Sequence, residues 1–217
     1  MTTTEPTVSA SAGPTPGDAP YLSMRRPQVL DAAVRMLAVG GDRALTYRAV
    51  DQAADVPPGT TSNHFRTRSS LLIGAASHTE RQRRRAFDAL LAQRKPTNTG
   101  QLAHMLRNYL LDAASEHSRA GMLARAHTAL LPMARTNPDI AELLAADRRH
   151  HINALRGQLA AINPDTPPRL ATLIADYLTG TLANHHATAD TKIDTTGLTA
   201  LIELLNHHNQ PAARAIR

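Results

Sequence analysis

The sequence contains no cysteine and no tryptophan, and only 3% of its residues are aromatic. Without cysteine the chain cannot form disulfides, thiolate nucleophiles or thiolate metal sites, which points to a reducing, cytoplasmic location. Any core must be built from Leu, Ala, Ile, Val and Met, and these residues suit helix packing better than sheets. We therefore expect an all-α fold.

Other absences narrow the function. No apolar run reaches the ~18 residues that a membrane span needs, and no basic-then-apolar leader opens the chain. There is no nucleophile elbow, no phosphate-cradling glycine loop and no strand pattern to carry either. We therefore expect neither an enzyme nor a membrane partner, and no cofactor.

Lysine is scarce too, because arginine supplies all the basic residues except Lys95 and Lys192. The formal net charge of +6 is unevenly placed: residues 21–70 carry +3, residues 71–95 carry +4, and residues 96–217 carry +1. A basic region of this kind attracts phosphate groups. The charge therefore predicts a nucleic-acid contact in the N-terminal half.

Three parts follow from composition and periodicity. Residues 1–22 are rich in Pro, Thr and Ser without apolar periodicity, and we expect a disordered tail. Residues 23–68 are predicted to form a helix-turn-helix domain whose first helix runs from Ser23 to Val39 and ends at Gly40-Gly41. Residues 69–217 show helical periodicity throughout and are predicted to form a larger domain, giving about nine helices in all.

The stretch from Asp42 to Arg68 predicts two short helices joined by a turn. Thr46 can cap the first helix, and Pro57-Pro58-Gly59 interrupts the apolar series so that a second helix restarts near Pro58. The second helix begins with hydrogen-bonding side chains only, from Thr60 to His64, which is typical of a surface made for contact.

The pattern resembles the TetR family of bacterial transcriptional regulators. The residues that carry the resemblance are Arg26, Val29, Leu30, Ala33, Val34, Leu37, Gly41, Leu45, Thr46, Arg48, Ala49, Val50, Ala53, Ala54, Val56, Gly59, Thr60, His64, Phe65, Arg68, Leu71 and Leu72. Two departures stand out: Pro57 occupies the cap position where the family often has serine, and Thr61-Ser62 replaces its usual Leu-Tyr.

The resemblance implies a dimeric regulator, a repressor that binds a near-palindromic operator in double-stranded DNA and is released by a small-molecule effector. Thr60, Thr61 and Asn63, with Ser62 and His64, are expected to face the major groove, where an amide can pair with an adenine edge. Arginines and a hydroxyl around the helix are expected to reach phosphate. The predicted DNA-binding residues are Arg25, Arg26, Thr46, Arg48, Thr60, Thr61, Ser62, Asn63, His64, Arg66 and Arg68.

The second domain is expected to hold the effector and the dimer interface. Flexible or amphipathic side chains that could line the effector pocket are Phe87, Met105, Tyr109, Met122, His127 and Met133, with core packing as the alternative for each. The last two long helices supply the interface candidates, with intrachain core as their alternative: Leu173, Ile174, Tyr177, Leu178, Thr181, Leu198, Leu201, Ile202 and Leu205.

The basic run Arg83-Arg84-Arg85 on the fourth helix is expected to form a solvated face rather than a DNA contact. The 11 histidines raise the question of a metal, but no two of them stand at i,i+3 or i,i+4, so no helix supplies a two-histidine chelate and we predict no metal site. The alternative to a DNA-binding regulator is a helical ligand-binding or protein-interaction module with a vestigial helix-turn-helix.

Overall fold

A computed structural model describes residues 18–188, 192–198 and 200–202, and these residues form helices and connecting turns without any strand. The elements are α1 Asp18–Ala44, α2 Tyr47–Ala54, α3 Thr60–His64, α4 Arg68–Arg94, α5 Thr99–Ala114, α6 Arg119–Leu130, the short 3-10 helix η1 Pro132–Arg135, α7 Pro138–Ile162 and α8 Arg169–Thr188. Residues 196–198 and 200–202 are also helical. The all-α prediction is confirmed.

Polar caps set most helix starts, including the one predicted at Thr46. The side chains of Thr46, Asn98, Ser118 and Asn137 each accept a hydrogen bond from a backbone N–H in the first turn of α2, α5, α6 and α7. Helix α4 begins at Arg68 because Thr67 forms the capping box with Ser70. Helix α6 breaks before Pro132, as proline requires.

The first helix is longer than the sequence predicts. It begins at Asp18, so residues 18–22, which we expected in the disordered tail, are helical, and residues 1–17 lie outside the described part. At the other end, Gly40 and Gly41 leave helical geometry as expected, but one further turn continues to Ala44.

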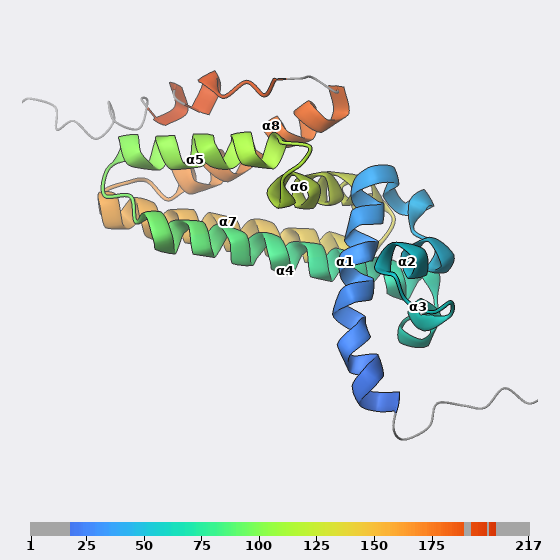
Figure 1. Cartoon of the computed structure of the whole chain (residues 1–217). Helices are drawn as coiled ribbons and strands as arrows, with labels where there is room; N and C mark the ends of the chain where they lie inside the picture. Colours follow the sequence, from blue (N-terminus) through green and yellow to red (C-terminus); the bar gives the residue numbers. More distant parts are fainter. Residues whose placement is uncertain (1–17, 189–191, 199, 203–217) are drawn as a thin grey trace, which may run out of the picture.

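Two apolar clusters hold the chain together. One joins the inner faces of α1, α2 and the start of α4, with Phe65 just after α3, to α6 and the first turns of α7, and it includes Val34, Leu37 and Leu130. The other lies among α4, α5, α7 and α8 around Phe87 and Leu155. Figure 1 shows α1 crossing one end of the long α4 and α7 pair, and α5 and α8 lie above this pair in the view. No helix of the described residues is long and apolar enough to cross a membrane.

Candidate nucleic-acid interface and ligand cavity

Asp51 on α2 places a buried carboxylate at the start of α3. Asp51 is 5% exposed, and its two oxygens accept hydrogen bonds from the Gly59 N–H (2.8 Å), the Thr61 N–H (2.8 Å) and the Thr61 hydroxyl. Gly59 has a φ of +90°, which glycine adopts at no steric cost. The five-residue α3 is too short to be stable alone, so Asp51 and this turn set its direction.

The same contacts overturn part of the predicted DNA surface. Thr60 and Thr61 are buried, and the Thr60 hydroxyl donates to the Pro57 carbonyl at 2.6 Å. Ser62 is half-buried and donates to the Gly59 carbonyl at 2.9 Å. The prediction that Thr60 and Thr61 face the groove is wrong, because their hydroxyls hold the turn together instead.

Three predicted contact residues stay available. Arg48, Asn63 and Arg66 are exposed, and none of their side chains makes a hydrogen bond or ion pair with a described residue. Thr46 is exposed as well, although its hydroxyl is engaged as the α2 cap. His64 is half-buried, and burial together with the nearby Arg26 lowers its pKa, which favours the neutral ring.

The flanking arginines have structural contacts of their own. Arg26 is exposed and lies over the Phe65 ring, 5.5 Å from its centroid, while Arg25 donates to Gln28 at 3.2 Å. Arg68 donates to the Asp42 and Leu45 carbonyls and forms an ion pair with Asp42 at 3.7 Å, yet 60% of its side chain is exposed. These arginines therefore brace the domain and still present charge at its surface.

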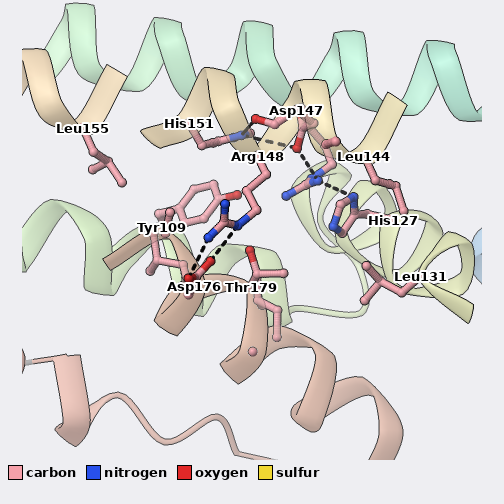
Figure 2. Close-up of a pocket in the computed structure, with 16 residues that line it drawn as sticks. Tyr109, His127, Leu131, Leu144, Asp147, Arg148, His151, Leu155, Asp176 and Thr179 are labelled. Carbon is pink, nitrogen blue, oxygen red and sulfur yellow. Dashed lines mark hydrogen bonds and ion pairs between the residues drawn. The ribbon is translucent and has the colours of Figure 1, made fainter. Parts of the chain in front are cut away.

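A cavity of about 290 Å³ lies among α4, α5, α6, α7 and α8 (Figure 2). Its walls combine leucine and alanine side chains with four charged residues. The lining residues are Arg83, Tyr109, His127, Leu131, Leu144, Ala145, Asp147, Arg148, His151, Leu155, Ala175, Asp176, Leu178, Thr179, Gly180 and Leu182.

Two of the six predicted pocket residues, Tyr109 and His127, line this cavity. Phe87 is fully buried in the core behind it, where its ring packs edge-on against Tyr109 at 5.5 Å. Met105 lines a separate groove of about 800 Å³ between α4 and α5. Met122 and Met133 pack against the N-terminal apolar cluster. These four residues therefore lie in the core or in the groove, and not in the cavity wall where the sequence predicts them.

The inner wall of the cavity is a charged cluster that the sequence analysis missed. Arg83 is not solvated: its Nη1 lies 3.0 Å from Glu80 Oε2 and 2.8 Å from Asp147 Oδ2, and it also contacts His127 Nδ1. Burial by itself would lower the pKa of Arg83, but Glu80 and Asp147 raise it well above its usual range. Burial would raise the pKa of Asp147, but the hydrogen bond from His151 and the charge of Arg83 lower it strongly. The charged forms of Arg83 and Asp147 therefore stabilise each other.

The histidines of the cluster are constrained too. Burial and the Arg83 charge lower the pKa of His127, whose Nδ1 is also 2.9 Å from Glu80 Oε1. His151 Nδ1 faces the Asp147 backbone carbonyl at 2.9 Å and the Asp147 carboxylate at 3.3 Å, so this nitrogen carries the hydrogen. His151 Nε2 and Asp147 Oδ1 are buried and have no hydrogen-bond partner among the residues that the structure describes.

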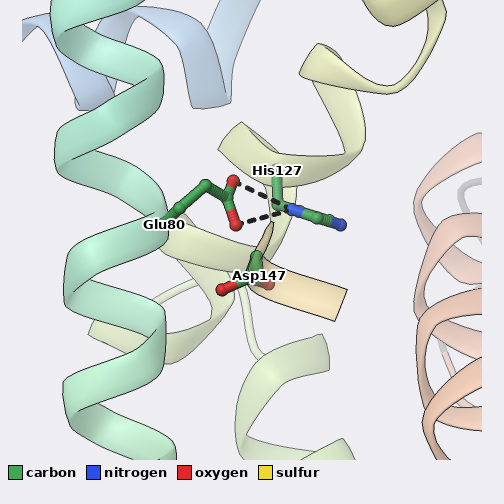
Figure 3. A group of neighbouring side chains, drawn as sticks. All are labelled: Glu80, His127 and Asp147. Carbon is green, nitrogen blue, oxygen red and sulfur yellow. Dashed lines mark hydrogen bonds and ion pairs between the residues drawn. The ribbon is translucent and has the colours of Figure 1, made fainter. Parts of the chain in front are cut away.

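Three of these side chains have the composition of a metal site. Ligand atoms of Glu80, His127 and Asp147 all lie within 4.8 Å of one another (Figure 3). The Arg83 guanidinium nitrogen already lies at hydrogen-bond distance from both carboxylates, however, and it provides the positive charge that a metal ion would provide. We therefore assign the three side chains to Arg83 and propose no metal there.

The cavity mouth is bridged by an ion pair between α7 and α8. Arg148 donates from Nε and Nη2 to the two carboxylate oxygens of Asp176, both at 2.8 Å, and about half of each side chain is exposed (Figure 2). The hydrogen bond from Arg148 to Asp176 is the main cause of a raised pKa of Arg148. The pair closes one side of the cavity without sealing it.

The predicted dimer-interface residues divide by exposure. Ile174, Leu178, Leu198 and Ile202 are buried in the chain's own core, so intrachain packing, the stated alternative, is correct for them. Leu173 is 49% exposed, and Tyr177, Thr181 and Leu201 are half-buried, so these four remain candidates. Leu205 lies outside the described residues.

The fold, the α2–α3 unit and the cavity together define a class of protein. It is an all-helical chain with an N-terminal helix-turn-helix and a C-terminal helical part that encloses a cavity. No protein-family model and no curated protein matches the sequence. Solved structures do match: a TetR-family member from Streptomyces coelicolor A3 is 25% identical with a TM-score of 0.59, over 84% of this chain and 96% of that one.

Two further solved structures agree. A putative TetR-family regulator from Mesorhizobium loti superposes with a TM-score of 0.70 at 13% identity, over 86% of this chain and 97% of that one. The multidrug binding protein EbrR, solved with imidazole, is 26% identical with a TM-score of 0.58, over 88% of this chain and 98% of that one. The chain has the fold of the TetR family of transcriptional regulators.

Proposed function

We propose that this chain is a TetR-like transcriptional repressor that acts in the cytoplasm, binds a near-palindromic DNA operator as a homodimer and is released by a small molecule. Residues 23–68 form its DNA-binding unit, and residues 69–217 bind the effector and dimerise. The observation that carries the proposal is the anchored helix α3 with exposed side chains on and beside it: Asn63 on α3, Arg48 on α2 and Arg66 just after α3. None of these three side chains makes a hydrogen bond or ion pair with a described residue.

The roles divide between affinity and sequence choice. Arg48 and Arg66, with the half-buried Arg25 and the braced but exposed Arg26 and Arg68, would neutralise phosphates and supply salt-dependent affinity. Asn63 is the exposed amide of α3 and would pair with an adenine edge. One base contact contributes only about 1–3 kcal/mol of discrimination, so a single five-residue helix gives too little specificity and a dimer is needed.

The cavity supports the effector role. It lies beside α4, whose first turn follows α3 directly, and beside α6, on which α1 packs extensively. A ligand that fits the cavity better in one arrangement of these helices would shift the population away from the DNA-binding one. Leu173, Tyr177, Thr181 and Leu201 are the residues that we propose for the dimer contact.

Selection of genomic DNA fragments in vitro by the purified protein tests the proposal, because the recovered sites name both operator and regulated genes. We expect Arg48→Ala to weaken binding to all sequences and to reduce its salt dependence. Asn63→Ala should relax the preference at one base pair per half-site. Arg119→Ala on α6 and Asn153→Ala on α7 change exposed side chains that have no hydrogen bond or ion pair with a described residue, and they should leave binding unchanged.

The outcome separates this function from the alternative. A DNA-binding regulator should lose affinity for DNA steeply as the salt concentration rises, and it should enrich a distinct set of DNA sites. If no fragment is enriched, or if Arg48→Ala and Asn63→Ala both bind like the parent protein, the helix-turn-helix is vestigial and the chain is a ligand-binding or interaction module.

A further inference from the structure

The charged groups around the cavity already neutralise one another. Arg148 is paired with Asp176 through two hydrogen bonds of 2.8 Å. On the inner wall, Arg83 lies between Glu80 and Asp147, and Arg84 approaches the other Asp147 oxygen at 3.9 Å. Three arginines therefore face three carboxylates. The remaining titratable groups that line the cavity are His127, whose pKa is lowered, His151 and Tyr109.

This balance disfavours a charged ligand. A ligand carboxylate or phosphate that bound Arg148 would displace Asp176 and be repelled by its negative charge. A ligand ammonium group that bound Asp176 would likewise be repelled by Arg148. Deeper in the cavity, a new charge would compete with a buried ion pair, and one partner left unpaired in a low-dielectric site is strongly unfavourable. A neutral molecule leaves every existing pair in place.

The remaining surface is apolar and compact. Five leucines and two alanines supply the aliphatic part of the wall: Leu131, Leu144, Leu155, Leu178, Leu182, Ala145 and Ala175. An engineered apolar cavity of about 150 Å³ holds one benzene ring. The cavity of about 290 Å³ is roughly twice as large, which corresponds to two fused rings.

One polar group is free to orient such a molecule. Thr179 lines the cavity and is half-buried, and its hydroxyl makes no hydrogen bond with any described residue. Figure 2 shows it on α8 between the Arg148–Asp176 pair and Leu131. Its hydroxyl can donate to or accept from a ligand without disturbing either ion pair.

Resting on the proposed function, we propose that the effector is an uncharged, largely apolar compound the size of two fused aromatic rings, with one hydrogen-bonding group that contacts Thr179. The charge balance of the lining, rather than any single residue, excludes anions and cations of the same size.

Three naphthalene probes of nearly equal size test the proposal: neutral 2-naphthol, anionic 2-naphthoate and cationic 2-naphthylmethylammonium. Their dissociation constants for the full-length protein are measured by calorimetry at pH 7. We expect 2-naphthol to bind at least tenfold more tightly than either charged probe. Equal or tighter binding of a charged probe, or no binding of 2-naphthol, overturns the proposal.

Two neighbouring alanines on α7 locate the binding site. Ala145 lines the cavity and Ala146 does not, and both are half-buried. Ala145→Leu fills the cavity and should weaken 2-naphthol binding at least tenfold, whereas Ala146→Leu should not. Equal binding by the two variants would place the probe elsewhere. If Ala145→Leu does not fold, Thr179→Val serves instead, and it should abolish the preference for 2-naphthol over naphthalene.

DNA binding by the same preparations separates the two proposals. If the protein selects DNA sites but 2-naphthol does not bind, only the ligand class is wrong. If 2-naphthol binds in the cavity while no DNA site is selected, the ligand class stands and the regulatory function fails.

Discussion

The carboxylate of Asp51 should decide whether the recognition helix is held in place. Asp51→Asn keeps the size of the side chain but replaces one acceptor oxygen with an NH₂ group. If the amide oxygen keeps the two bonds from Thr61, the NH₂ group must face the Gly59 N–H, which now contacts Asp51 Oδ2 at 2.8 Å. The substitution therefore loses one bond, sets two donors against each other and weakens the other two bonds.

The size of the effect follows from these contacts. Hydrogen bonds to charged groups contribute about 1.5–3 kcal/mol each, so losing one and weakening two should cost about 3 kcal/mol of unfolding free energy. For a domain of this length that corresponds to a Tm decrease of roughly 6–12 °C. Misplacing Asn63 removes a base contact of about 1–3 kcal/mol per half-site, or roughly 5- to 150-fold in affinity.

Asp55→Asn provides the matched control. Asp55 is exposed, ends α2 in the left-handed conformation that asparagine tolerates, and makes no side-chain contact with a described residue. Both variants remove one negative charge near the DNA surface, so their difference isolates the geometry. Thermal melts followed by circular dichroism, and fluorescence anisotropy on a selected operator, measure the two effects.

The reasoning fails if Asp51→Asn melts and binds DNA like Asp55→Asn. A variant that is destabilised but binds the operator normally would refute the narrower claim that Asp51 positions α3. In that case the turn at Gly59 would be sufficient to orient the helix.

Three further predictions concern the interior. Arg83→Met leaves two buried carboxylates without their cation and should cost about 3–5 kcal/mol in urea unfolding, whereas the exposed Arg85→Met should be nearly neutral. Gly74→Ala places a Cβ 2.5 Å from the buried Phe65 ring and should cost about 1–3 kcal/mol by the same measurement, and an unchanged midpoint would contradict this packing. Burial and the neighbouring His185 lower the pKa of His186 to about 4, so the unfolded chain binds more protons between pH ~6.5 and 4. The free energy of unfolding should therefore fall as the pH drops through that window. Its dependence on pH should be weaker in His186→Gln than in the exposed control His117→Gln.

Helix positions could be predicted from the sequence because caps and breakers act locally. Thr46, Asn98 and Pro132 each act within about one turn of their own position, so a short stretch of sequence is sufficient to interpret them. Thr60 and Thr61 were assigned to the DNA surface because five consecutive polar residues are typical of contact. Their true partners are the Pro57 carbonyl and Asp51, and no local pattern shows that Asp51 turns inward.

The cavity was harder to predict for the same reason. Arg83 stands in a basic run that is typical of a solvated face, and one of the two carboxylates that pair with it, Asp147, is 64 residues away. His127 and Tyr109 were identified by residue type alone. The size of the cavity and the pairing of its charges depend on how five helices meet, which helical periodicity does not specify.

The positive charge of the inner wall is carried by the Arg83 guanidinium, a group that is covalently attached to the chain. Two carboxylates and an imidazole surround it much as they would surround a metal ion, but a guanidinium does not dissociate, exchange or change oxidation state. The cluster is therefore complete as soon as the chain folds, whatever the metal supply of the cell, and a chelator has nothing to remove from it.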